Sequence, residues 1–241
     1  MILYLNRTLK VGSMFEPKHL EFFENSCKHY SLILENSVQQ LIFQFGSSFG
    51  DVLELGAGAG GFTKVLCENI EFKSYCALDI DNTLLTLVDK FLINSKYVEL
   101  IESDAIVFLN STGTQFDLIT SSFLVHNMPL NDKTRLFRLL SKQLKQDGLF
   151  LLVDKIGKEK NTDLNSLQLQ IGEFFDYSRR SKFDDTDSLE YWVNHYINDE
   201  KQNLRYDEVQ LEALASQFGL EAIYKSKRYN MDMFYIFKKL I

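Results

Sequence analysis

A short apolar segment that ends in a turn of small residues constrains this chain more than any other stretch. It runs Asp51-Val52-Leu53-Glu54-Leu55-Gly56-Ala57-Gly58-Ala59-Gly60-Gly61. Residues 52–55 are short and apolar enough for a strand buried on both faces, and residues 62–70 have helical character. Glycines at the junction let the backbone turn sharply and let a ligand approach, while the next helix offers free N–H groups. We therefore expect an α/β fold with a nucleotide-type cofactor at this turn.

The glycines alone leave two cofactors open. Gly56, Gly58 and Gly61 satisfy the spacing G-x-G-x-x-G, which suits NAD as well as S-adenosyl-L-methionine (SAM). Glu54 favours SAM, because a carboxylate beside the turn would repel a pyrophosphate but would suit the ammonium and sulfonium groups, directly or through water. We expect Glu54 and the turn residues Gly56, Ala57 and Gly58 to hold the cofactor.

Length and charge narrow the class of protein. The chain has 241 residues, 45% of them hydrophobic, which suits one domain with a sizeable core. A net charge of -7 argues against extended binding to nucleic acid or to an anionic membrane and favours a small or neutral substrate. Residues 1–14 lack the apolar core of a signal peptide, and no run is long enough to span a bilayer. The three cysteines lack metal-ligand spacing, so we expect reduced thiols, a soluble cytoplasmic protein and no metal site.

The N-terminal region predicts two helices before the first strand. Apolar residues between positions 17 and 45 form helical stripes, which are interrupted near Tyr30-Ser31. Tyr30 would begin the second helix and could cover the cofactor turn. An ordinary half-buried tyrosine is the alternative.

A second strand-helix unit places an acid where a ribose would lie. Residues 74–78 are apolar and end at Asp79-Ile80-Asp81, about twenty residues after the glycines. At the end of this strand Asp79 can accept hydrogen bonds from both ribose hydroxyls, and Ile80 can form a wall of the adenine pocket. Asp81 is better suited to capping the helix predicted over residues 83–93.

Two further strands carry the other candidate site residues. After a strand over residues 97–101, Asp104 can accept from the adenine amine and Ala105 leaves space for the ring; helix capping by Ser103 or Asp104 is the alternative. The fourth strand, 116–120, is followed by Ser121, Ser122 and His126. Ligands of a parallel sheet bind beyond the carboxyl ends of its strands, so these three should lie near the reacting end of the cofactor. His126 is a candidate base or a side chain that packs over the cofactor. A fifth strand, 149–153, follows and leads into Asp154-Lys155.

Together these motifs resemble the class I SAM-dependent methyltransferases over residues 30–239. The matching segments, in order, are ELGAGAGG, ALDID, Asp104-Ala105 and SSFLVHNMP. The resemblance implies a Rossmann-like, doubly wound seven-stranded sheet whose last strand is antiparallel, with SAM as cofactor and S-adenosyl-L-homocysteine (SAH) as product. It also implies one domain over 1–241: N-terminal helices (1–46), a SAM-binding core (47–156), a helical lid inserted after strand five (157–205), and a closing helix with a β-hairpin (206–241).

Within that class the layout looks most like the branch of carboxy-SAM synthase and related small methyltransferases. The resemblance matches the tyrosine of that branch to Tyr30 and its polar residue after the fourth strand to Ser122. Carboxy-SAM synthase holds the extra carboxylate with an arginine of the insertion, and the comparable stretch here, 190–196, has none. Ordinary methyl transfer is therefore preferred over a carboxy-SAM synthase-like, tRNA-modifying activity, although Arg179 or Arg180 could replace the arginine under another alignment.

The insertion is expected to select the acceptor. Its apolar residues repeat at helical spacing, and aromatic walls suit a flat apolar or heterocyclic acceptor. Tyr177, Trp192 and His195 are the candidates for acceptor contact. For most of the other aromatic residues, packing in a core or in a homodimer interface is the preferred interpretation.

The predicted activity is methyl transfer to a small-molecule acceptor by in-line displacement. The protein then needs mainly to hold the nucleophile in line and to exclude water. An acceptor oxygen of high pKa would also need a base, for which His126 or His195 is available. Two rival hypotheses are an NAD-dependent oxidoreductase, which leaves Glu54 and Asp104 unexplained, and a noncatalytic SAM-binding partner protein.

Overall fold

The computed structural model describes residues 17–91, 98–157, 206–229 and 231–240, with positions 168, 171, 172, 175 and 197. Side chains are described from Tyr30, apart from those of residues 89–91. The described elements alternate between strand and helix along most of the chain, as expected for an α/β fold. No helix of the described part is long and apolar enough to cross a membrane.

One seven-stranded sheet forms the centre of the molecule. Its strands are β1 (Ser48–Leu55), β2 (Glu71–Asp79), β3 (Val98–Glu102), β4 (Phe116–Ser122), β5 (Leu144–Lys155), β6 (Leu220–Lys225) and β7 (Asp232–Lys239). They lie in the order β3-β2-β1-β4-β5-β7-β6. β7 is antiparallel to both β5 and β6, whereas the pairs among β1 to β5 are parallel. The predicted doubly wound sheet with an antiparallel last strand is confirmed.

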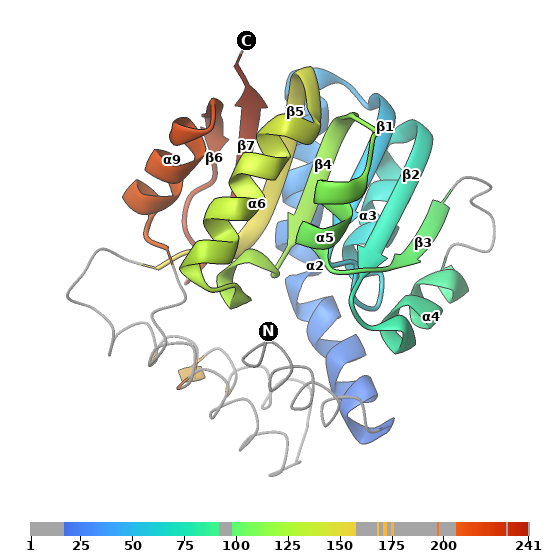
Figure 1. The fold of residues 1–241 in the computed structure, drawn as a ribbon. Helices are drawn as coiled ribbons and strands as arrows, with labels where there is room; N and C mark the ends of the chain where they lie inside the picture. Colours follow the sequence, from blue (N-terminus) through green and yellow to red (C-terminus); the bar gives the residue numbers. More distant parts are fainter. Residues whose placement is uncertain are drawn as a thin grey trace.

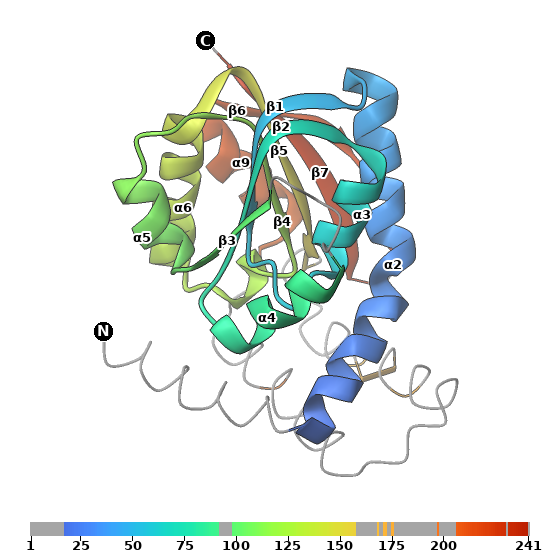
Figure 2. The same cartoon turned by 90° about the vertical axis from the view of Figure 1, so that its right-hand side faces the viewer.

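Helices cover both faces of the sheet. On one face lie α2 (Pro17–Phe45), α3 (Gly61–Asn69) and α4 (Asn82–Phe91); on the other lie α5 (Ala105–Ser111), α6 (Leu130–Gln143) and α9 (Glu208–Gln217). Figure 2 shows the sheet almost edge-on between α5 and α6 on its left and α2 and α3 on its right. The N-terminal half of α2 extends past the carboxyl ends of the parallel strands (Figure 1).

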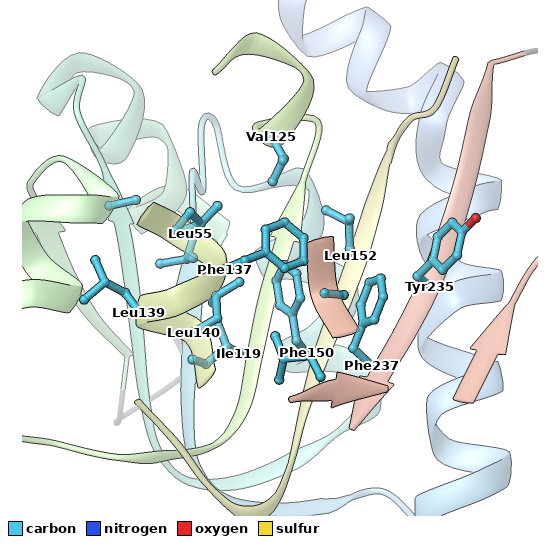
Figure 3. Packing of buried hydrophobic residues seen from close by; sticks show 14 of the residues in the cluster. Leu55, Ile119, Val125, Phe137, Leu139, Leu140, Phe150, Leu152, Tyr235 and Phe237 are labelled. Carbon is cyan, nitrogen blue, oxygen red and sulfur yellow. The ribbon is translucent and has the colours of Figure 1, made fainter. Parts of the chain in front are cut away.

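Burial on both faces explains why the central strands are almost continuously apolar. In β1, Leu53 faces one helical layer and Val52 faces the other, and both are fully buried. Phe137 of α6 meets Phe150 and Phe237 edge-on, with ring centroids 6.0 and 6.1 Å apart (Figure 3). Such aromatic packing joins α6 firmly to β5 and β7, which keeps the carboxyl ends of the strands in fixed positions.

The N-terminal helix differs from the sequence prediction. We expected a break near Tyr30-Ser31, but α2 continues without interruption from Pro17 to Phe45. Leu34, Val38 and Leu41 lie on one face of this helix and are buried against the sheet and α3. A polar gap in the apolar pattern does not stop a helix when tertiary packing overrides local preference, and the turns after the gap are packed in this way. Tyr30 therefore lies within a helix and does not begin one.

The lid predicted over 157–205 falls mostly outside the described residues. Positions 168, 171, 172, 175 and 197 are helical. The structure does describe how the chain enters and leaves this segment. Gly157 and Asp207 form an isolated parallel bridge, and Arg228 bonds to the carbonyl oxygens of Ile156 and Gly157 and to Glu208. The end of β5 and the start of α9 are therefore held together.

An ion cluster lies toward the amino-terminal ends of three central strands, away from the carboxyl ends where the site is expected. Lys145 lies 2.8 Å from an oxygen of Asp51 and 2.7 Å from an oxygen of Asp117. Asp117 also accepts from the backbone N–H of Asp51 at 2.6 Å. A Cβ on Gly50 would lie 2.3 Å from the Asp117 Oδ2, so only glycine leaves room for this carboxylate. The cluster joins β1, β4 and β5 at one edge.

Candidate functional site at the carboxyl ends of the strands

The sheet order places a switch point between β1 and β4. From β1 the chain continues to β2 on one side, whereas β4 leads to β5 on the other. Loops that leave neighbouring strands in opposite directions open a crevice beyond the carboxyl ends, where ligands of doubly wound sheets bind. The glycine turn after β1 and the segment with His126 after β4 border this crevice.

The glycine turn is held open by backbone geometry. Gly56, Gly58 and Gly60 have φ angles of 73°, 54° and 84°, which favour glycine strongly. The N–H groups of Gly56 and Ala57 both donate to the carbonyl of Leu78, at 2.8 and 2.9 Å, so the turn is anchored on β2. No side chain caps the start of α3 among the described residues. The first N–H groups of α3 are therefore available to a ligand.

Close packing gives Gly56 a second reason to be glycine. A Cβ at this position would meet three side-chain atoms of Leu124 at 3.2–3.3 Å. Leu124 belongs to the segment after β4, so the two loops of the switch point touch each other. The sequence patterns predicted both loops but not this contact.

Asp79 connects the end of β2 to the glycine turn. Its Oδ2 accepts from the Gly58 N–H at 2.9 Å, and its Oδ1 accepts from the Asp81 N–H at 3.0 Å. Burial raises the pKa of Asp79, while these backbone hydrogen bonds act in the opposite direction. Each carboxylate oxygen has a second acceptor site, so Asp79 retains capacity for hydroxyl donors. Asp81 caps α4 by accepting from Thr83 and Leu84, as predicted, and the side chain of Ile80 is 44% exposed.

Glu54 lies beneath the turn instead of facing out of it. The side chain is fully buried, and Oε2 accepts from the hydroxyls of Thr63 (2.7 Å) and Tyr75 (2.5 Å). Burial raises the pKa of Glu54 to about 7, although both hydrogen bonds act to lower it. Oε1 has no partner among the described residues, and neither has Oγ1 of Thr120, the residue opposite Glu54 on β4. The sequence pointed to Glu54 but not to Thr63 and Tyr75, which come from a helix and a neighbouring strand.

Asp104 caps a helix, which was the alternative to its predicted contact with adenine. Its Oδ1 accepts from the N–H groups of Ile106 and Val107 at 2.9 and 3.0 Å and so caps α5. Oδ2 takes no part in either bond, and a contact between Asp104 and an adenine amine therefore stays a prediction. Ala105 is buried at the start of the helix.

The two serines after β4 have different surroundings. Ser121 is fully buried, and its hydroxyl donates to the carbonyl of Leu55 at 3.2 Å, which ties β4 to β1. Ser122 is partly buried at the strand end. Of the two predicted contacts with the cofactor, Ser122 is the one whose side chain reaches the surface.

Tyr30 lies over the end of β4, because α2 extends past the sheet. Its ring centroid is 4.5 Å from that of Phe123, a residue with a φ of 52°. The Lys155 Nζ lies 5.2 Å from the Tyr30 ring and 3.1 Å from Asp232 Oδ1, and both ends of that ion pair are buried. A cluster thus forms at the ends of β4 and β5 from Tyr30, Phe123, Lys155 and Asp232, a grouping that no sequence motif indicated.

His126 forms a buried pair with Asp154. His126 belongs to η1 (Val125–Asn127), and Asp154 lies near the end of β5. Nδ1 of His126 is 2.5 Å from Oδ1 of Asp154, and the His126 backbone N–H donates to Oδ2 at 2.8 Å. The sequence showed Asp154 only as the residue that ends strand five. Its position at the carboxyl end of a strand next to β4 is the signal that could have identified it.

The other candidates lie outside the described residues. These are Tyr177, Trp192 and His195. Their contact with an acceptor stays a prediction. No group of three or more His, Cys, Asp or Glu side chains in the described part could hold a metal ion.

Comparison with known proteins gives one family match and many similar folds. A family model described as a methyltransferase domain matches residues 29–225. The N-methyltransferase NodS from Bradyrhizobium japonicum WM9 has a TM-score of 0.57 and 14% identity, covering 86% of this chain and 94% of that chain. A SAM-dependent methyltransferase from Clostridium acetobutylicum ATCC 824 has a TM-score of 0.60 and 15% identity, covering 85% of this chain and 90% of that chain. An O-methyltransferase family protein from Burkholderia thailandensis has a TM-score of 0.66 and 12% identity, covering 93% of this chain and 60% of that chain. No protein of curated function matches the sequence.

Proposed function

The chain belongs to the methyltransferase domain family and is a class I SAM-dependent methyltransferase, and on this premise we propose that it methylates a small-molecule acceptor by in-line displacement. The observation that carries the proposal is the glycine turn at the β1/β4 switch point, held by Asp79 through the Gly58 N–H. This arrangement offers backbone donors, a carboxylate and an open backbone surface in one place.

The residues of the site fit SAM. Gly56, Ala57 and Gly58 would approach the methionine portion closely, because no side chain projects from either glycine. Asp79 would accept from the ribose hydroxyls through the acceptor sites that its backbone partners leave free. The exposed Ile80 would pack against the adenine ring. Asp104 stays a candidate for contact with the adenine amine, and Ser122 for contact near the reacting end of the cofactor.

Glu54 would act on the ammonium group from below the turn. Because the side chain is fully buried, a direct contact would require the turn to move, whereas a water could connect Oε1 to the ligand. A positive ligand beside this carboxylate would favour its charged form. This role supports SAM over NAD, whose pyrophosphate the same charge would repel.

When bound, SAM supplies an activated methyl group on a sulfonium. The chain then has to orient an acceptor nucleophile in line with that carbon, exclude water and accept a proton where the acceptor carries one. The side of the crevice formed by Tyr30, Phe123 and Lys155 is where we place the acceptor. We keep the proposal that Tyr177, Trp192 and His195 of the lid contribute to acceptor choice.

Isothermal titration calorimetry with SAM, SAH and NAD tests the cofactor assignment. We expect saturable binding of SAM and SAH and none of NAD. Mass spectrometry of any ligand that copurifies with the protein should identify SAM or SAH, because the stretch 190–196 lacks the arginine of carboxy-SAM synthase. Carboxy-SAM in that position would favour the alternative activity, and SAM binding without turnover of any acceptor would favour a noncatalytic role.

A further inference from the structure

The surroundings of His126 determine where its ring proton lies. Asp154 Oδ1 is 2.5 Å from Nδ1 of His126 and also accepts from the Lys155 N–H at 3.0 Å. Asp154 Oδ2 accepts from the His126 N–H at 2.8 Å. Both oxygens therefore already accept backbone donors, and a carboxylate has only acceptor sites to offer. Nδ1 must carry a proton to bond with it, so the neutral ring has its lone pair on Nε2.

Two bonds from one carboxylate also fix how the ring is oriented. Asp154 holds both the backbone and the ring of His126, and it lies on β5, which is paired to β4 directly before η1. Only 7% of the His126 surface and 2% of the Asp154 surface is exposed, so both residues are buried. A histidine held in this way by a buried carboxylate is preorganised to accept a proton at Nε2.

The same loop reaches the glycine turn. Leu124, two residues before His126, packs where a Cβ of Gly56 would lie. His126 is thus carried by a short segment anchored on β1 at one end and on β5 at the other. Among the described residues, Asp154 is the charged side chain that is paired with His126, and the residue after Asp154, Lys155, is paired with Asp232 at 3.1 Å.

We propose that the acceptor is a hydroxyl compound and that His126 Nε2 accepts its proton during O-methylation, with Asp154 as the positioning residue. This inference rests on the methyltransferase activity proposed above. The acceptor oxygen forms the bond to the methyl carbon, the electron pair of the carbon–sulfur bond returns to sulfur, and the hydroxyl proton moves to Nε2. The imidazolium that results is paired with the Asp154 carboxylate. A neutral amine already has a free lone pair and would not require this pair.

Two variants distinguish a His126 that acts as a general base from one that only holds the loop in place. In His126→Asn the side-chain amide can still donate to Asp154, but nothing replaces Nε2. In Asp154→Asn only one of the two positions can be an oxygen, so either the His126 N–H loses its acceptor or the ring changes tautomer. Asp147→Asn, at an exposed position of β5, is the matched control for the loss of a carboxylate.

The first measurement uses the protein without cofactor or acceptor. Nitrogen-15 and proton NMR of the imidazole should show the Nδ1–H tautomer with a low-field Nδ1 proton in the parent protein and in Asp147→Asn. Asp154→Asn should lose that signal. An Nε2–H tautomer in the parent protein would overturn the proposal whatever the activity.

The second measurement identifies the methylated atom. The protein is incubated with SAM labelled with carbon-13 in its methyl group and with a small-molecule extract of the cells that express it. The chemical shift of the labelled product separates O-methyl, N-methyl and C-methyl groups. We expect O-methyl, and in His126→Asn a kcat about 10²- to 10⁴-fold lower with little change in KM or in SAM affinity. An N- or C-methyl product, or full turnover by His126→Asn, would refute the hydroxyl acceptor while leaving methyl transfer intact. No labelled product at all would refute the methyltransferase proposal itself.

Discussion

The Tyr75 hydroxyl donates to the fully buried carboxylate of Glu54 across neighbouring strands, at 2.5 Å, directly beneath the glycine turn. Thr63 donates to the same oxygen from the first turn of α3. The carboxylate is thus partly satisfied by the protein before any ligand arrives, and burial still raises its pKa to about 7. The stability of the unit formed by β1, the glycine turn and α3 therefore depends on whether Glu54 is protonated.

The first prediction is that the ligand-free protein loses stability as pH rises toward neutrality. The folded-state pKa of Glu54, about 7, lies above the ordinary value of 4.5, so the folded state binds more protons than the unfolded state between these values. The free energy of unfolding then falls as pH rises through this window, by about 3 kcal/mol at most from this group, because each pKa unit corresponds to about 1.4 kcal/mol. Urea unfolding of Glu54→Gln at several pH values should show a smaller fall than the parent. Glu71→Gln, at an exposed position, should keep the parent slope.

The second prediction separates backbone strain from ligand contact. Gly56→Ala and Gly46→Ala both place a side chain at a positive φ, of 73° and 80°, and each should lower the free energy of unfolding by about 1 kcal/mol. Only the Cβ at position 56 meets Leu124, whereas no atom of the described residues lies within 4 Å of the one at position 46. SAM affinity, measured by calorimetry, should fall in Gly56→Ala alone. Equal affinities in the two variants would contradict the assignment of the turn.

The third prediction concerns the two acids that follow β2. Asp79→Asn has one oxygen in place of two, so it cannot keep both backbone bonds and the ribose hydroxyls, and SAM affinity should fall about 10- to 100-fold. Asp81→Asn is the control, because Asn caps a helix as well as Asp does and Oδ1 alone accepts the capping bonds. Titration calorimetry checks both. A similar loss in Asp81→Asn would mean that the geometry of the loop, and not the ribose acceptor, controls binding.

The fourth prediction tests whether the ion cluster of Asp51, Asp117 and Lys145 contributes to stability but not to SAM binding. Gly50→Ala would bring a Cβ to 2.3 Å from Asp117 Oδ2, and the displaced carboxylate would lose its bonds to Lys145 and to the Asp51 N–H. We expect a loss of about 2 kcal/mol in the free energy of unfolding. Gly113→Ala has open space around it and should cost little. SAM affinity below the unfolding transition should be unchanged in both, since the cluster lies at the amino ends of the strands.

Local patterns in the sequence were sufficient to predict most of the strands and helices, whereas the seven-stranded sheet with its antiparallel last strand was implied by the resemblance to class I methyltransferases. The apolar run before Gly56, the acids after the second and third strands, and the hairpin around Tyr229 each depend on residues close together in the chain. Turn chemistry and strand burial are local consequences of side-chain size and polarity, so such patterns are informative without a partner structure. The same locality explains the error in α2. The polar gap at Tyr30-Ser31 predicts a break, yet Val38 and Leu41 are buried against elements that come later in the chain.

Contacts between distant segments were decided only by the tertiary structure. Tyr75 and Thr63 meet Glu54 because β2 and α3 pack beside β1, and Asp154 meets His126 because β5 lies next to β4. No spacing in the sequence encodes those distances, since they depend on sheet order and on the register of each strand pair. The sequence by itself determined that a glycine turn would follow the first strand and that a histidine would follow the fourth. Tertiary packing decided that the glutamate would be buried with two hydroxyl donors and that the histidine would lie against a buried aspartate.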